Sequence, residues 1–135
     1  MVVYPNKKPG EVSPLVLAYL GDAVYELYVR RYLINKDIAK VNKLHKKATS
    51  LVSAVAQARF LHGIEATLTE EEKNIVRRGR NAKSAHIPKN TEVFEYRLST
   101  GFEALIGYLF LAGKEERLGE IMSSIFKQNE IKEGE

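Results

Sequence analysis

The sequence predicts an all-α protein with five or six helices in a single domain. Apolar residues recur at helical spacing along most of the chain, as they do at Leu17, Leu20, Val24 and Leu27. No Asn-Gly or Asp-Gly pair indicates a β-hairpin turn. A chain of 135 residues, of which 44% are hydrophobic, can build one domain with a substantial core but is too short for two.

Helix boundaries can be placed from capping residues and apolar stripes. Ser13 and Pro14 have the residue types of an N-cap and a first helical residue, and this helix should run to about Leu33. Thr69 and Glu72 have the spacing of a capping box. The remaining helices are expected from Ala39 or Val41 to about Gly63, from Thr69 to about Arg78, from Glu92 to about Ala112, and around Leu118 to Phe126. We expect an extension over residues 1–12, the domain over 13–130 and a charged tail over 131–135.

Composition narrows the class of protein. The net charge of +4 is only a weak indication of a polyanionic partner. The absence of cysteine excludes disulfides and thiolate metal sites and favours hard cations, Mg²⁺ or alternatively Mn²⁺. No apolar run reaches the roughly 20 residues of a membrane span, and residues 1–11 lack the apolar segment of a signal peptide. We therefore expect a cytoplasmic protein without membrane attachment.

Two acidic residues interrupt the apolar helices. Asp22 follows Gly21 in the first helix, and Glu103 follows Phe102 in the fourth. A carboxylate that loses its water must be paired, protonated or bound to a metal, whereas one that points to solvent needs no partner. Glycine inside a helix costs about 1 kcal/mol relative to alanine. Gly21 therefore predicts the close approach of another helix or of a ligand.

The economical account of the two acids is that they meet in space and share a divalent cation. Mg²⁺ keeps several waters and takes phosphate oxygens as further ligands, so a carboxylate pair in a basic protein suits phosphodiester hydrolysis. The cation would lower the pKa of a water molecule and stabilise charge on the phosphate. The alternative is that Asp22 is solvated or pairs with a lysine.

Positive charge is clustered in two segments. Between Lys73 and Lys89 the chain has six lysines and arginines and no acid, and we expect a basic loop from Arg77 to Thr91. The second cluster lies at the start of the second helix, where the helix dipole does not favour it. The residues expected to contact phosphates are Lys43, Lys46, Lys47, Arg77, Arg78, Arg80, Asn81, Lys83 and Lys89. A solvated lysine face and a loop without function are the alternatives.

Three segments together resemble a known family. Leu20-Gly21-Asp22-Ala23-Val24 resembles the leucine-glycine-aspartate segment of the ribonuclease III signature. Phe102-Glu103-Ala104-Leu105-Ile106-Gly107 is similar to the second acidic motif of the same domains. The segment from Arg77 to Thr91 resembles the basic loop of the Mini-ribonuclease III family, which has the catalytic domain without a double-stranded-RNA-binding domain. The resemblance extends from about Pro14 to Leu118.

The resemblance implies an activity and a set of partners. It implies a ribonuclease III-like helical endonuclease that needs Mg²⁺ and cuts double-stranded RNA, leaving 5′-phosphate and 3′-hydroxyl ends. Asp22 and Glu103 would be the catalytic metal ligands, and the basic residues given above would bind RNA. It further implies a homodimer that matures the ends of the large-subunit ribosomal RNA precursor, with a large-subunit ribosomal protein as a stimulator.

Two positions depart from the wider ribonuclease III pattern. Ala18 and Thr100 stand where the larger enzymes carry two further acids. Thr100 could hold a metal-bound water, and Glu26 could serve as an outer ligand or be solvated instead. These departures motivate the alternative of a catalytically inactive RNA-binding or ribosome-associated module on the same fold. A helical protein-interaction domain with no RNA role is the third hypothesis.

Overall fold

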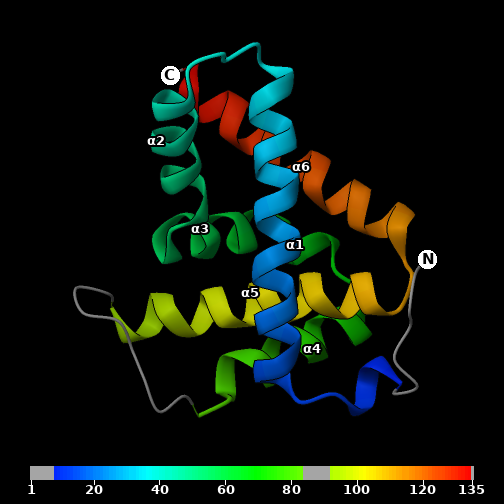
Figure 1. Ribbon diagram of the computed structural model, residues 1–135. Coiled ribbons are helices and arrows are strands. Elements are labelled where there is room, and N and C mark those ends of the chain that lie inside the picture. Colours follow the sequence, from blue (N-terminus) through cyan, green and yellow to red (C-terminus); the bar gives the residue numbers. More distant parts are fainter. Residues whose placement is uncertain (1–7, 84–91, 135) are drawn as a thin grey trace.

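The computed structural model describes residues 8–83 and 92–134 and is built from helices (Figure 1). Within these ranges there are six α-helices and no strand, which confirms the predicted class. The helices are α1 (Pro14–Asn35), α2 (Val41–Val52), α3 (Ala54–Ile64), α4 (Glu70–Asn81), α5 (Val93–Leu111) and α6 (Glu115–Glu133). Short 3-10 turns lie at Pro9–Glu11 and Glu65–Thr67. Among the described helices, none combines the length and the apolarity that crossing a bilayer requires.

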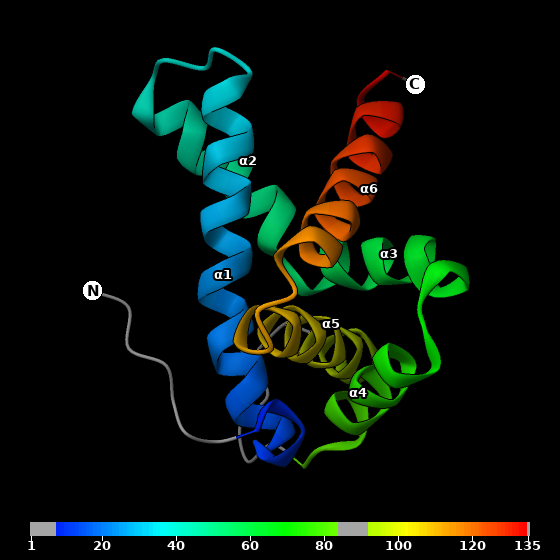
Figure 2. The ribbon, with the colours of Figure 1, turned by 90° about the vertical axis from the view of Figure 1, so that its right-hand side faces the viewer.

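Helix α5 is the central element. Figure 2 shows α5 almost end-on, with α1 on one side of it and α3 and α4 on the other. Residues on all its faces are buried in the run from Ser99 to Leu109, apart from the half-buried Glu103. A helix that is apolar nearly all round belongs in the centre of a fold, and α1 and α4 make the most extensive contacts with it. Elements packed on α5 are therefore the ones that can build a site around Glu103.

The predicted start of α1 is confirmed. Ser13 is the N-cap, its hydroxyl accepts a hydrogen bond from the amide of Val16, and Pro14 opens the helix. Farther along α1, Tyr25 is fully buried and donates a hydrogen bond to the carbonyl of Leu51 at 2.8 Å. The Tyr25 ring also packs edge-on against Phe102 of α5. Tyr25 thus fixes α1 against both α2 and α5.

The second predicted helix is in fact two helices. We expected continuous helix to about Gly63, but Ser53 adopts an extended conformation and caps a new helix by accepting from the amide of Ala56. This break turns the chain between α2 and α3 (Figure 1). In the sequence an apolar stripe keeps its helical spacing across the break, so periodicity alone does not reveal it. The stripe consists of Leu44, Ala48, Leu51, Val55 and Ala58.

The start of the predicted basic loop is also wrong. Helix α4 begins with the predicted capping box of Thr69 and Glu72, but it continues to Asn81. Gly79 does not interrupt the helix. It allows α4 to approach α5 closely, since a Cβ atom there would lie 2.8 Å from the Cα atom of Gly101. Arg77, Arg78, Arg80 and Asn81 therefore project from a helix, and Lys83 follows it. Lys89 and the rest of the predicted loop from residue 84 to 91 lie outside the described residues.

The end of α5 follows the prediction, whereas α6 is longer than predicted. Gly113 has a positive φ of 71°, and it ends α5 as expected. Helix α6 then runs to Glu133, so residues 131–133 are helical. Its C-terminal half packs on α1, where Phe126 stacks on Tyr32 and Lys36 pairs with Glu130 and Glu133.

Candidate active site

The crossing of α1 and α5 brings the two predicted acids together. A Cβ atom built on Gly21 would lie 1.8 Å from the carbonyl oxygen of Glu103, and one built on Gly107 would lie 2.0 Å from the carbonyl oxygen of Leu17. Only hydrogen fits at these two points, so the backbones of the two helices are in contact. Asp22 follows the first glycine, and Glu103 lies four residues before the second on the same side of α5. The prediction that Gly21 admits another helix is confirmed.

The carboxyl group of Asp22 lies close enough to that of Glu103 to act on its ionisation. Asp22 is exposed on α1 and Glu103 is half-buried on α5. Burial, followed by the charge of Asp22 and the hydrogen bond with it, raises the pKa of Glu103 to about 8, and the charge of Glu26 adds to this. A raised pKa at Glu103 favours either a proton on this group or a cation that binds it.

A third side chain, Gln57 of α3, contacts this acid pair. Its amide nitrogen donates to the Glu103 carboxylate at 3.4 Å and to the carbonyl of Val52 at 3.2 Å. The hydrogen bond from Gln57 favours the ionised form of Glu103 and lowers its pKa, against the effect of burial. Sequence reasoning missed Gln57, because a single uncharged residue on a helix has no distinguishing pattern.

The donor set fits a hard divalent cation. A cation would take the place of a proton on Glu103 and offset the repulsion between Asp22 and Glu103, and carboxylate oxygens are ligands that Mg²⁺ prefers. In residues 8–83 and 92–134, no group of three or more histidines, cysteines or acids is arranged to hold a metal. A cation here would therefore rely on two carboxylates, with water or substrate oxygens completing its ligands.

The positions that lack the additional acids are both buried. Ala18 is buried on α1. Thr100 is buried on α5, and its hydroxyl donates a hydrogen bond to the carbonyl of Tyr96 at 3.0 Å. The Thr100 oxygen keeps a lone pair that can accept a hydrogen bond. Glu26 is half-buried, close enough for its charge to act on Glu103. The outer-ligand roles of Thr100 and Glu26 stay predictions.

The basic residues fall into two groups at opposite ends of the molecule. Helices α2 and α4 lie at these ends in both views, with α5 between them (Figures 1 and 2). On α2, Lys43 and Lys46 are exposed, whereas Lys47 is half-buried and lies 3.9 Å from Glu133. The structure therefore does not form one continuous patch from the two groups within the described residues.

Three cations of α4 line an open groove between α3 and α4. The groove has a volume of about 630 Å³. Its charged lining residues are Lys73, Arg77, Arg80, His62 and Glu65. Lys73, Arg77 and Arg80 follow at i, i+4 and i+7, so they share one face of α4. Lys73 and His62 were not among the predicted phosphate contacts, although the helical spacing of Lys73 could have identified it. Arg78 turns elsewhere, toward the carbonyl of Gly10.

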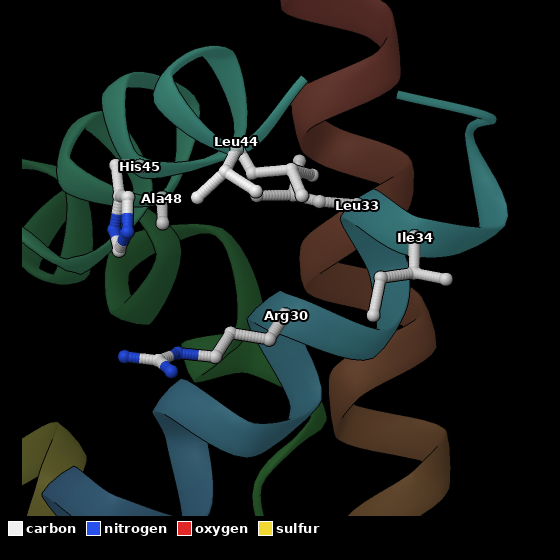
Figure 3. A pocket seen from close by; sticks show the side chains of 7 residues that line it. Arg30, Leu33, Ile34, Leu44, His45 and Ala48 are labelled. Carbon is white, nitrogen blue, oxygen red and sulfur yellow. The ribbon is translucent and has the colours of Figure 1, made fainter. Parts of the chain in front are cut away.

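A smaller pocket lies between α1 and α2, away from the acids (Figure 3). It measures about 240 Å³ and is lined mainly by apolar side chains, including Leu33, Leu44 and Ala48. Arg30 and His45 stand at one edge of it (Figure 3). Because this pocket contains no acid, it does not contribute to the carboxylate site.

Comparisons with known proteins agree with this arrangement. Residues 15–114 match the ribonuclease III domain family. The chain is 54% identical to Mini-ribonuclease 3 of Brevibacillus brevis over 130 residues, which is 96% of this chain and 95% of the relative. It is 52% identical to Mini-ribonuclease 3 of Symbiobacterium thermophilum over 116 residues, covering 86% and 89% of the two chains. A crystal structure of a Fusobacterium nucleatum protein superposes with a TM-score of 0.81 at 34% identity, covering 92% of this chain and 99% of that one.

The fold, the acid pair and these matches define a ribonuclease III-type endoribonuclease, a class of hydrolases that generally depend on divalent metal ions. Within that class the chain belongs to the Mini-ribonuclease 3 family. The resemblance found in the sequence is thereby confirmed.

Proposed function

We propose that this protein is a Mg²⁺-dependent endonuclease that cuts double-stranded RNA and leaves 5′-phosphate and 3′-hydroxyl ends. The observation that carries the proposal is the meeting of Asp22 and Glu103 at a crossing where glycine backbones touch. Placing the half-buried Glu103 beside a second acid is costly, and a divalent cation that binds both carboxylates and a phosphate would offset this cost.

Asp22 and Glu103 hold the cation in this proposal. When bound, the cation activates water and stabilises the charge that develops on the scissile phosphate. The protein contributes by holding the two carboxylates in place. Glu103 lies on α5 and Asp22 on α1, and the contact between the two helix backbones fixes the position of one acid relative to the other. The exposed cations Arg77 and Arg80 bind phosphates of the RNA backbone, which positions the duplex without reading its sequence.

The proposal includes a homodimer. Val16, Ala23 and Leu27 lie at i, i+7 and i+11 and are exposed on one face of α1, with Tyr19 beside them. Tyr19 is 83% exposed and Leu27 is 68% exposed. An apolar stripe of this kind indicates an interface, and a second copy of the chain would cover it and place two acid pairs on one duplex.

The cellular role we infer is maturation of the large-subunit ribosomal RNA precursor in the cytoplasm, with a large-subunit ribosomal protein as a stimulator. Family membership supports this role. It is tested by incubating the protein with transcripts of precursor ends, with and without added large-subunit proteins. Cleavage at unrelated duplexes but not at these ends would count against it.

The activity itself is tested with a long double-stranded RNA in Mg²⁺, in EDTA, and with Asp22→Asn. We expect the wild type to cut only with the cation, and the variant to bind without cutting. The released fragments should be substrates for an exonuclease that requires a 5′-phosphate. Cutting that survives in EDTA would refute the proposal.

One observation favours a second candidate. Ala18 and Thr100 leave the site with two carboxylates instead of four, so the domain could bind RNA without cutting it. In the same experiment, this binding module would retain the duplex equally with Mg²⁺ and with EDTA and release no product from either form.

A further inference from the structure

The side chain of Gln57 is a buried polar group to which the proposed chemistry gives no role. It is 2% exposed and lies on α3, which packs against α5. Its amide oxygen Oε1 has no hydrogen-bond partner. A buried polar atom without a partner is costly, so a purely structural position would normally carry an apolar residue. A polar side chain at position 57 therefore indicates a role other than packing.

The orientation of the amide is fixed by its neighbours. The nitrogen Nε2 lies near the Val52 carbonyl oxygen and near Oε2 of Glu103, and both of these are acceptors. If the amide were turned over, its oxygen would face two other oxygens, so only the NH₂ group fits there. The Val52 carbonyl is free to accept because α2 ends at this residue. The helix break at Ser53 thus leaves the Val52 carbonyl as an acceptor, and the bond to this carbonyl orients the Gln57 amide toward Glu103.

The hydrogen bond from Gln57 engages one oxygen of the Glu103 carboxyl group, Oε2. A donor on one carboxylate oxygen restricts rotation of the group and leaves the other oxygen for a cation. Partners of this kind commonly determine how well a metal ligand performs.

We propose that Gln57 is the positioning residue for Glu103, which it holds in the orientation that binds the divalent cation. This inference rests on the proposed function. The unpaired Oε1 is the other half of the same amide, and it stays buried because Nε2 is placed at Glu103.

The test compares Gln57→Met with a matched control, Gln128→Met. Methionine keeps the length and volume of glutamine but removes both the donor and the acceptor. Gln128 also donates its amide nitrogen to a carbonyl of α3, that of Phe60 at 3.3 Å, and no contact joins it to the acid pair. Three quantities are measured: kcat and KM for a long double-stranded RNA across Mg²⁺ concentrations, cation affinity of the RNA-free protein by calorimetry with Mn²⁺, and the midpoint of thermal unfolding in EDTA.

For Gln57→Met we expect kcat and cation affinity to fall by about 10- to 100-fold. The KM for RNA should stay within about twofold, because the residue does not face the duplex, and the unfolding midpoint in EDTA should not fall. Gln128→Met should cut and bind Mn²⁺ like the wild type.

The inference is overturned by wild-type kcat and cation affinity in Gln57→Met, or by equal losses in the control. Failure of the proposed function looks different, since the wild type itself would then not cut. In that case the Mn²⁺ titration still decides: weaker binding by Gln57→Met alone supports the positioning role, and a wild type that binds no cation removes both proposals.

Discussion

Gly21 and Gly107 lie against each other, and neither position has room for a side chain. A Cβ atom on Gly21 would be 2.9 Å from the amide nitrogen of Gly107, and a Cβ atom on Gly107 would be 3.0 Å from the amide nitrogen of Gly21. The contact is thus reciprocal, and it sets the distance between the helices that carry Asp22 and Glu103. Fold and site depend on the same pair of glycines.

Gly21→Ala should therefore destabilise the protein strongly. The new methyl group would meet the backbone oxygen of Glu103, which cannot move aside without separating α1 from α5. We expect a loss of about 3 kcal/mol or more in the free energy of unfolding, at the upper end of overpacking effects. Urea unfolding at neutral pH measures it.

Gly119→Ala is the matched control. Gly119 lies within α6, and a Cβ atom there has no neighbour within 4 Å. This substitution should stabilise the protein by up to about 1 kcal/mol through helix propensity alone. Equal and small effects at both glycines would show that the helices do not touch as described.

Sequence reasoning predicted the features of this site that have a local signal. Asp22 and Glu103 stood out as acids in apolar helices, and Gly21 as a costly residue in a helix. Their meeting could not follow from spacing alone, since it depends on how α1 crosses α5; there the family resemblance supplied the connection. Gln57 has no local signal, because its importance arises from a contact with a residue far along the chain.

The errors have a common cause in tertiary packing. Gly79 falls in the segment that was predicted to be a loop, yet it lets α4 approach Gly101, and the helix continues past it. At Ser53 a helix was predicted to continue, yet it ends there although the apolar stripe of the sequence is unbroken. In both places the local preference is weak, and contacts with α5 or α3 decide the outcome.

Glu72 and Arg117 provide a prediction about pH. Glu72 is 4% exposed and accepts from Arg117 through both carboxylate oxygens, at 2.7 and 2.8 Å. These bonds are the main reason that the pKa of Glu72 lies below its usual value. A depressed pKa contributes stability above the unfolded-state value of about 4.3, and that stability is lost as the pH falls through the folded-state pKa.

Glu72→Gln should therefore be less stable than the wild type at pH 7, and the difference should shrink as the pH falls below about 4.3. Arg117→Met should cost about 3 kcal/mol at pH 7, because it leaves a buried carboxylate with only the Thr69 amide as donor. Urea unfolding at a series of pH values checks both. A constant difference between wild type and Glu72→Gln would contradict the assignment.

Asp22→Asn should stabilise the protein when no cation is present. The substitution removes a negative charge that opposes ionisation of Glu103, and we expect a gain of about 1 kcal/mol, seen as a rise of a few degrees in the unfolding midpoint in EDTA. Mg²⁺ should raise the midpoint of the wild type and leave that of the variant unchanged.

Asp37→Asn controls for the change in net charge. Asp37 is exposed in a turn with a φ of 59°, a conformation that asparagine also adopts. Its unfolding midpoint in EDTA should stay at the wild-type value, and Mg²⁺ should still raise it. A gain as large as that of Asp22→Asn would mean that net charge, not the acid pair, is responsible.

The exposed stripe on α1 predicts the effect of one substitution on oligomeric state. Leu27→Glu places a charge in the apolar stripe, so we expect a dimeric wild type to become monomeric in analytical ultracentrifugation. Ile131→Glu is the control, because Ile131 is 61% exposed on α6 and lies outside the stripe. Dissociation by the control alone would move the interface to α6.

Arg80 tests whether the groove on α4 binds RNA. It is preferable to Arg78, whose contact with Gly10 would also be lost on charge reversal. Arg80→Glu should weaken binding of double-stranded RNA in EDTA about tenfold. It should also lower the slope of log Kd against log salt concentration by about one, as expected when one phosphate contact disappears.

Lys132→Glu makes the same change in charge on α6, away from the groove, and is expected to change the affinity little. If both reversals weakened binding equally, the RNA would be responding to net charge and the groove would have no special part. If neither did, affinity would have to come from other cations, and the exposed Lys43 and Lys46 of α2 would be the next to reverse.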